Sequence, residues 1–337
     1  MNKISFYGFG AFNSALAHYF DKEKNFSMSC YDKDEKVKES IDKERRHPHH
    51  FTNMTYSKKL SVTNDLKELL LAAEFLIIGL PTQIIRENLK PIKDLLNKET
   101  TIIIVSKGLE IGTNKRISEI VKEELGHRKI AVFAGGTVAS DIANRIPLIA
   151  EVASEDKETR EKVAGLFHSE SLRIYTNPDV VSVELSSALK NIVSIGAGIC
   201  DGLGFTIGTK ASFITRATRD IYKIAKAMGA HDKTFLPGSA SVWGDIILSA
   251  FGPTRNYEFG KRLCSKNPKE VLELMNKEHK TIEGYWTVKA VRTMSKEKGI
   301  DTPCIEQVYK IVHEEVKPLV ALKELFERKR TSIDSND

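Results

Sequence analysis

The feature that most constrains this chain is a pair of glycines set between an apolar run and a helix-like segment. Residues 4–7 form a short apolar run that leads into Gly8-Phe9-Gly10, and residues 14–20 then have a helical composition. A strand that turns through glycines into a helix is typical of the start of a dinucleotide-binding unit. This pattern predicts that the chain begins with a parallel sheet covered by helices.

Strands and helices alternate through the first half of the chain. Residues 27–31, 75–80, 101–105 and 130–134 are strand-length runs, and the last three are continuously apolar, as expected of parallel strands covered on both faces. After about residue 178 the pattern is mainly helical, over 181–200, 210–228, 268–298 and 302–328. A chain of 337 residues is long enough for two domains. We predict a doubly wound α/β domain over 1–177 and a helical domain over 178–337.

Charge and composition argue against several classes of partner. Lys and Arg number 51 against 45 Asp and Glu, and the net charge of +6 is spread along the chain without a basic arm. We therefore expect no nucleic-acid partner. We expect no signal peptide, and no apolar run that reaches the roughly 18 residues that a bilayer requires. We expect a cytoplasmic protein without a membrane span.

Metal-ligating residues are present, but their spacing is poor. The four cysteines, at 30, 200, 264 and 304, match neither a zinc pattern nor a redox pair. His47, His49 and His50 flank Pro48 in a polar segment that we interpret as a surface loop. We predict no metal site.

The glycine loop supplies the candidate cofactor site. Gly8 permits the tight turn, Gly10 lets the backbone approach a pyrophosphate, and the helix that starts near Ala11 and Phe12 offers free N–H groups. Asp32, at the end of the strand 27–31, is placed to bind a ribose 2′-hydroxyl, which favours NAD over NADP. Asn13 replaces the third glycine of the fingerprint, and either displaces the helix slightly or reaches the pyrophosphate itself.

Two lysines are candidates for the chemistry. Lys107 follows the strand 101–105, at the sheet edge where open α/β sheets bind ligands. Lys190 lies in a strongly apolar helix, where desolvation lowers the pKa of a lysine toward neutrality and suits it to proton exchange. A lysine that extends along a helix surface would give the same pattern.

A short segment later in the chain offers partners for Lys190. Asp245 precedes an apolar stretch, where a carboxylate needs a nearby cation, and Ser249 shares its helical face. Arg255 and Asn256 follow a Gly-Pro turn and have the chemistry of a phosphate site, although an exposed Arg-Asn pair in a turn would look the same.

An ordered series of motifs gives these residues a context. The series runs GFGAFNSALA (8–17), SKGLE (106–110), ALKNIVSIGAGICDGLGF (188–205), TKASFITR (209–216), GDIILS (244–249), TRNYEFG (254–260) and IEGYWT (282–287). In order and spacing it resembles the NAD-dependent glycerol-3-phosphate dehydrogenase family from end to end. The resemblance implies an N-terminal Rossmann domain, an all-helical C-terminal domain and an active site in the cleft between them. It also implies a homodimer that interconverts dihydroxyacetone phosphate and glycerol 3-phosphate with NAD(H), supplying glycerol 3-phosphate for phospholipid synthesis.

The resemblance also implies residue roles, carried over by position. Lys190 is similar to the family's general acid/base, with Asp245 as its charge partner and Asn191 and Ser249 in the supporting network. Lys107 resembles the lysine that orients the substrate oxygen. Arg255 and Asn256 resemble the pair that binds substrate phosphate close to the cofactor. Thr137 and Ala139 belong to a loop near the nicotinamide, and Glu283 is a cofactor-side candidate.

Four departures from the family pattern surround these positions. They are Asn13, the Gly136-Thr137 loop, Gly208 in place of the usual asparagine, and the long segment 234–244. They leave two alternatives open: a related NAD-dependent dehydrogenase of another small 2-hydroxy acid or phosphate, or an inactive NADH-binding sensor.

Overall fold

The chain forms two compact units in a computed structural model that describes residues 3–24, 26–126, 129–278 and 282–329. The first unit comprises residues 1–107 and 115–184, and the second comprises 108–114 and 185–337. The predicted boundary at 177/178 falls between the last strand and the helix α8 (Val180–Gly202), whereas the contacts divide at 184/185, inside α8. The first turn of α8 is held to the first unit by Glu184, which accepts hydrogen bonds from Arg116 and from the backbone of Ser118.

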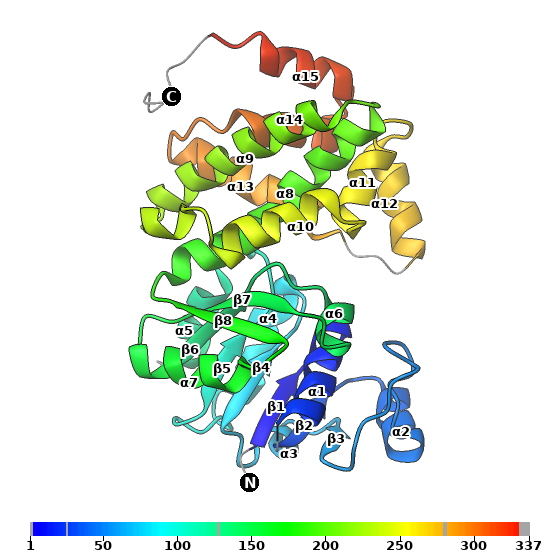
Figure 1. Cartoon of the computed structure of the whole chain (residues 1–337), viewed down its shortest axis with the longest axis vertical. Coiled ribbons are helices and arrows are strands. Elements are labelled where there is room, and N and C mark those ends of the chain that lie inside the picture. Colours follow the sequence, from blue (N-terminus) through cyan, green and yellow to red (C-terminus); the bar gives the residue numbers. More distant parts are fainter. Residues whose placement is uncertain (1–2, 25, 127–128, 279–281, 330–337) are drawn as a thin grey trace. The chain divides into compact units, whose positions relative to one another are not determined.

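Eight strands form a single sheet in the first unit (Figure 1). Their order is β3-β2-β1-β4-β5-β6-β7-β8; β6 and β7 pair antiparallel and the other neighbours pair parallel. The strands are β1 (Lys3–Tyr7), β2 (Ser27–Tyr31), β3 (Leu60–Thr63), β4 (Phe75–Ile78), β5 (Thr101–Ile104), β6 (Ile130–Ala134), β7 (Leu148–Ala153) and β8 (Leu172–Asn177). The chain order reverses between β1 and β4, and this switch point places the loop after β1 at the carboxyl edge of the sheet.

The prediction of a mostly parallel, doubly wound sheet is confirmed. β4, β5 and β6 are buried along their whole length, which explains their continuously apolar sequences. β3, β7 and β8 were not predicted. β8 lies at the edge of the sheet with Arg173 and Tyr175 accessible, so its sequence lacks the strong apolar signal of a central strand.

Helices cover both faces of the sheet. One apolar layer packs β1, β2 and β6 against α1 and α7, and a second packs β4 and β5 against α4 and α5. The helical segments of this unit are α1 (Ala11–Glu23), α2 (Glu35–Glu44), α3 (Leu66–Leu70), η1 (Thr82–Ile84), α4 (Ile85–Leu89), η2 (Lys90–Ile92), α5 (Ile117–Leu125), α6 (Ala139–Ala143) and α7 (Lys157–Phe167).

The described part of the second unit is mainly helical, as predicted (Figure 1), although its residues 108–114 are not helical. Its helices pack around α8, in which every residue from 182 to 200 is buried. The others are α9 (Ile207–Ala227), η3 (Asp232–Phe235), the π-helix η4 (Ala240–Gly244), α10 (Asp245–Phe251), α11 (Arg255–Arg262), α12 (Pro268–Lys277), α13 (Glu283–Glu297), α14 (Pro303–His313) and α15 (Pro318–Phe326).

The core helix α8 is long and apolar enough to cross a bilayer by length and composition alone. The sequence prediction overlooked it because serines, glycines and Lys190 interrupt a strict apolar run. In the structure 89% of its most apolar window is buried inside the protein, as expected of the central helix of a bundle.

Candidate active site

The glycine loop joins β1 to α1 and has the geometry of an anion-binding turn. Gly8 adopts φ +90°, and a Cβ there would lie 2.8 Å from Leu80 Cδ2. Gly10 has an ordinary φ of −70°, and a Cβ there would meet nothing within 4 Å. The fold therefore requires glycine at position 8, whereas the open space at Gly10 is suited to a bound group. Behind it the N-terminus of α1 carries no side-chain cap and no acidic residue in its first turn, so its N–H groups are suited to a pyrophosphate.

Asn13 occupies the position of the third fingerprint glycine, and its side chain turns inward. It is 1% exposed, and its Nδ2 donates to the Gly8 carbonyl at 2.6 Å, while its Oδ1 is buried without a hydrogen bond from the described residues. The amide fits because it packs against Gly79, where a Cβ would come within 2.4 Å of Asn13 Nδ2. The helix α1 can thus pack closely because the glycine stands at position 79 and not at position 13. The side chain of Asn13 stabilises the glycine turn through its hydrogen bond to the Gly8 carbonyl.

His47 also braces this loop, which the sequence analysis missed. Its Nδ1 accepts from the backbone N–H groups of His49 and His50, so its Nε2 carries the proton and donates to the Phe9 carbonyl at 3.0 Å. The interpretation of this segment as a simple surface loop is wrong for His47, which is 2% exposed and packs on the ring of Phe9. Burial, reinforced by the neighbouring His50, lowers the pKa of His47 to about 4, so the neutral form persists at physiological pH.

Other cofactor-side candidates lie along the same sheet edge. Asp32 follows β2, is partly exposed, and accepts a hydrogen bond from the Asp34 N–H at 2.9 Å through Oδ1. Phe12 packs its ring against Phe133 of β6, and Ala11 is exposed at the start of α1. In the loop after β6, Ala139 begins α6 and is partly buried.

Two substrate-side candidates also belong to the first unit. The Thr137 N–H donates to the Gly135 carbonyl at 2.7 Å, and its buried hydroxyl lies 3.4 Å from the same oxygen. Lys107 follows β5 and is partly exposed. Its carbonyl accepts from the Thr82 hydroxyl at 3.0 Å, which anchors the backbone beneath its side chain.

The second unit contains the buried ion pair that the sequence suggested. Lys190, on α8, is 9% exposed, and its ammonium forms an ion pair with the fully buried Asp245 at the start of α10. The other carboxylate oxygen of Asp245 accepts from the Ser187 hydroxyl at 3.1 Å. Ser187 was not predicted, although it lies one helical turn before Lys190. The π-helix η4 leads directly into Asp245, an irregularity often found at functional sites.

A chain of hydrogen bonds continues from the residue next to Lys190. Asn256 Nδ2 donates to Asn191 Oδ1 at 3.0 Å, and Asn256 Oδ1 accepts from the Gly284 N–H at 2.9 Å. These bonds tie α8, α11 and the start of α13 together. Helices α8 and α11 can approach this closely because a Cβ on Gly260 would lie 2.0 Å from the Ile195 carbonyl oxygen.

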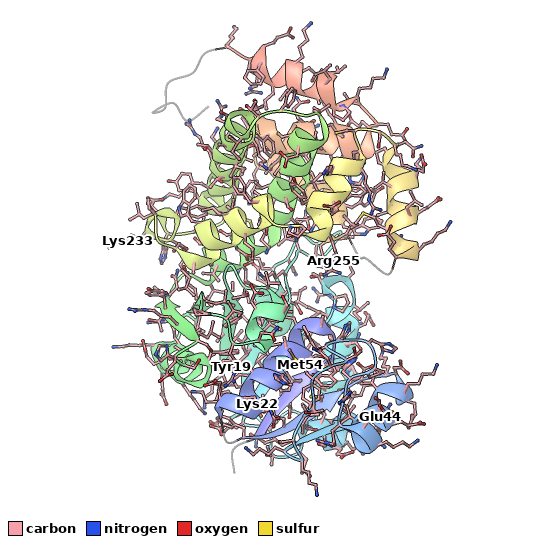
Figure 2. The ribbon with its side chains drawn as sticks, turned by 45° about the vertical axis from the view of Figure 1, so that its right-hand side comes forward. Tyr19, Lys22, Glu44, Met54, Lys233 and Arg255 are labelled. Atoms are coloured by element: carbon pink, nitrogen blue, oxygen red, sulfur yellow. The ribbon has the colours of Figure 1, made fainter. Side chains whose placement is uncertain are left out.

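The phosphate candidate Arg255 stands at the first position of α11, next to Asn256 (Figure 2). It is exposed, and no hydrogen bond or ion pair to another described side chain is recorded for it. Glu283, at the start of α13, is partly buried; burial raises the pKa of Glu283, and the charge of Arg255 opposes this rise. An exposed guanidinium beside a fixed amide is suited to a phosphate group.

Ser249 belongs to a second hydrogen-bond network of this unit through its backbone carbonyl. Its carbonyl accepts from the Ser194 hydroxyl at 2.6 Å, and Ser194 in turn contacts the Thr254 hydroxyl at 2.8 Å. No hydrogen bond of the Ser249 hydroxyl itself is recorded within the described residues. Ser194 is therefore a second network member that sequence reasoning missed, because a serine in an apolar helix carries no signal of its partner.

The predicted residues thus form two groups. The first unit contains the glycine loop, Asp32, Ala139, Thr137 and Lys107, whereas the second contains Lys190, Asn191, Asp245, Ser249, Asn256, Arg255 and Glu283. Among the described residues, no cluster of three or more His, Cys, Asp or Glu side chains is arranged to hold a metal ion.

Comparison with known proteins identifies the family. Residues 3–160 match the model of the NAD-dependent glycerol-3-phosphate dehydrogenase N-terminus, and residues 179–323 match that of its C-terminus. Glycerol-3-phosphate dehydrogenase [NAD(P)+] of Clostridium perfringens is 32% identical over 97% of this chain and 98% of its own length. The enzyme of the same name from Thermobifida fusca is 31% identical over 97% of both chains.

Solved structures agree with this result. The crystal structure of glycerol-3-phosphate dehydrogenase from Coxiella burnetii has a TM-score of 0.89 and 27% identity, covering 97% of this chain and 99% of that one. A complex of D-mandelate dehydrogenase with NADH, at a TM-score of 0.57 and 14% identity, shares the fold alone. The chain belongs to the NAD-dependent glycerol-3-phosphate dehydrogenase family.

Proposed function

We propose that this chain interconverts dihydroxyacetone phosphate and glycerol 3-phosphate, as its family membership indicates, with Lys190 as the proton-transfer group. One observation supports this role above the others. A lysine ammonium is held in the interior by a fully buried carboxylate, next to a hydrogen-bonded Asn191–Asn256 pair that ends beside the exposed Arg255. Such an arrangement combines a proton donor with a phosphate anchor, which reduction of a phosphorylated ketone requires.

The residues of the first unit would hold the dinucleotide. The open space at Gly10 and the uncapped start of α1 fit a pyrophosphate, with Ala11, Phe12 and Ala139 nearby in the same unit. Asn13 and His47 keep the turn in shape through the carbonyls of Gly8 and Phe9. When bound, the nicotinamide supplies or accepts the hydride. Glu283 remains a proposed cofactor-side residue.

Lys190 would donate a proton to the C2 oxygen in the reducing direction and take it back in the oxidising direction. Asp245 keeps the ammonium charged and oriented, and Ser187 fixes the carboxylate by binding its second oxygen. The fixed acid would favour the developing alkoxide without reorganisation of solvent. Lys107 would orient a substrate oxygen, as the resemblance implies; its backbone is anchored by the Thr82 hydroxyl.

The substrate phosphate would bind Arg255 and Asn256. Arg255 provides an exposed guanidinium without a carboxylate in hydrogen-bond contact among the described residues, and Asn256 is immobilised by Asn191 and Gly284. Thr137 is a further proposed substrate contact, and Ser249 supports the site through its carbonyl.

The cofactor preference follows from Asp32. The relatives are named for NAD(P)+, which includes both dinucleotides. A partly exposed carboxylate after β2 accepts hydrogen bonds from a ribose 2′-hydroxyl and repels a 2′-phosphate. We propose NAD(H) as the preferred cofactor.

The proposed cellular setting is the cytoplasm. The four cysteines are free thiols, in keeping with a reducing compartment such as the cytoplasm. The family resemblance supports a homodimer that supplies glycerol 3-phosphate for phospholipid synthesis.

An assay of NADH oxidation in the presence of dihydroxyacetone phosphate tests the proposal. The same assay is repeated with NADPH in place of NADH, and with phosphate-free dihydroxyacetone in place of the phosphorylated ketone. We expect turnover with NADH, at least tenfold lower kcat/KM with NADPH, and strongly reduced turnover without the phosphate. Equal rates with the phosphate-free ketone would indicate a dehydrogenase of another hydroxy compound. Binding of NADH without turnover of any substrate would indicate a sensor.

A further inference from the structure

A cavity of about 510 Å³ lies in the helical unit, between one face of α9, the chain that enters α14, and the end of α15. The described residues that line it include none of those assigned above to the dehydrogenase reaction. Four of the lining residues lie three or four positions apart on α9: Phe213, Arg216, Arg219 and Lys223. They therefore share one face of this helix, and that face lines the cavity.

One part of the cavity is apolar. Its apolar lining comprises Phe213 of α9 and Leu322, Leu325 and Phe326 of α15. Phe213, Leu322 and Leu325 also line a second cavity of about 30 Å³, whose other walls are mostly apolar. The two cavities therefore share a wall, and an apolar chain in the larger one can extend toward the smaller.

The other part is cationic. Five basic side chains, at 216, 219, 223, 328 and 329, line the cavity against two carboxylates. Both carboxylates are engaged: Asp301 pairs with Arg328 at 2.5 Å, and the 3%-exposed Asp220 accepts from the backbone N–H groups of Cys304 and Ile305.

Arg216 is a basic side chain of this cavity that is suited to binding an anion. It is exposed, and no hydrogen bond or ion pair of its side chain is recorded within the described part of the chain. It lies one helical turn after Phe213, so the guanidinium stands next to the apolar wall.

We propose that this cavity binds a single amphipathic anion, an apolar chain that carries a phosphate or carboxylate group. The head group would bind Arg216, and the chain would pack among Phe213, Leu322, Leu325 and Phe326. Apolar walls supply the burial, and a few placed polar groups fix the orientation, as in most small-molecule sites. A concave volume of about 510 Å³ favours one free molecule over a bilayer surface. The proposal is independent of the dehydrogenase reaction.

Calorimetric titration of the full chain with decyl phosphate, kept below its micelle concentration, tests the proposal. We expect saturable binding of one molecule per chain, and a loss of two- to fourfold in affinity for roughly each methylene removed on going to hexyl phosphate. Arg216→Gln should weaken binding about tenfold, because a charge-assisted hydrogen bond is lost. Phe326→Ser, at a side chain that is 72% exposed and tolerant of change, should weaken it several-fold.

Matched controls identify the site. Lys277→Gln removes the same charge from the exposed surface of α12 and should leave the affinity unchanged within twofold. Saturating glycerol 3-phosphate should not displace decyl phosphate. Displacement would place the probe at the substrate phosphate site and overturn the proposal. Equal binding of decyltrimethylammonium, an equal loss in Lys277→Gln, or association with phosphatidylglycerol vesicles but not with the monomeric probe would each overturn it as well.

Discussion

Two lysine–aspartate pairs lie in the helical unit, and their lysines are almost equally buried. Lys190 is 9% exposed and pairs with Asp245, whereas Lys210 is 7% exposed and pairs with Asp201 at 2.7 Å. Burial and pairing therefore cannot tell which lysine performs chemistry.

Their surroundings differ. The Lys210 ammonium lies over the rings of Phe251 and Tyr257, and the Tyr257 hydroxyl donates to the same carboxylate. This closed cluster ties α9 to α8 and α11; burial and the hydrogen bond to Asp201 raise the pKa of Tyr257 to about 12. Lys190 instead neighbours the Asn191–Asn256 bridge that leads to the exposed Arg255. We therefore interpret the Lys210 pair as structural, because its own packing surrounds it, and we propose the Lys190 pair as the reactive one, because it adjoins groups suited to binding a ligand.

Replacement of each lysine by alanine tests this distinction and should give the largest effect. Lys190→Ala should lower kcat by about 10² to 10⁴-fold with little change in NADH affinity, because proton transfer contributes roughly that factor. Lys210→Ala should lower the melting temperature but keep kcat within about tenfold of the parent.

Lys190→Ala leaves the fully buried Asp245 without its cation, whereas Lys210→Ala leaves Asp201, whose side chain is 25% exposed and still accepts from Tyr257, so a loss of stability is expected from both and a larger one from Lys190→Ala. Steady-state kinetics, NADH titration and thermal melts separate the effects. Comparable losses of kcat in the two variants would remove the distinction between the pairs.

Two arginines on α11 extend the comparison to the substrate. Arg255→Ala should raise the KM for dihydroxyacetone phosphate about 10- to 100-fold, since a charge-assisted phosphate contact is lost. Arg262→Ala, which breaks a surface ion pair with Glu278, should change KM less than twofold. The test is the KM for phosphorylated and phosphate-free ketone; a rise of equal size for both would argue against a phosphate contact.

The two loop glycines of the Rossmann unit allow a comparison between a position proposed to bind a ligand, Gly10, and a position required by the fold, Gly8. Gly10→Ala should weaken NADH binding about tenfold without loss of stability, because its Cβ would enter open space at an allowed φ. Gly8→Ala should lower stability, because φ is +90° and the Cβ would collide with Leu80. NADH titrations and thermal melts measure both. Unchanged NADH affinity in Gly10→Ala would show that no ligand approaches this backbone.

The smallest effect concerns His47 and pH. The pKa of His47 is lowered from its usual 6.5 to about 4, so as pH falls the unfolded chain takes up the proton before the folded one. The stability contributed by neutral His47 is complete above about pH 6.5 and is lost between about pH 6.5 and 4. Relative to pH 7, this loss should be about 1 kcal/mol at pH 5.5.

His47→Gln keeps a donor toward the Phe9 carbonyl but cannot titrate. Its free energy of unfolding, measured by urea denaturation, should therefore depend less on pH across this window. If the free energy of unfolding of His47→Gln depended on pH as that of the parent does, His47 would not be held in its neutral form by burial.

Much of the fold was predictable because it depends on the local pattern of apolar and polar residues along the sequence. Continuous apolar runs identified β4, β5 and β6, and the switch to helical periodicity identified the second unit. β3 and β8 were missed because edge strands carry polar residues at alternate positions. The membership of residues 108–114 in the second unit could not be read from sequence, because it depends on tertiary packing.

For the candidate site, residue types and family spacing led to Lys190, Asp245, Arg255 and Asn256. Their partners were not predictable. Ser187, Ser194 and His47 act through contacts between segments 38 to 60 residues apart in the sequence, and no local signal marks such pairs. Lys210 was not singled out for the same reason, although it is as buried as Lys190.

The most direct test of the account measures kcat for Lys190→Ala, Asp245→Asn and the double variant. If the ammonium and its carboxylate act as one proton-transfer unit, the double variant should lose no more than Lys190→Ala alone, within about threefold. Losses that multiply in the double variant would contradict the account, because the two side chains would then contribute independently.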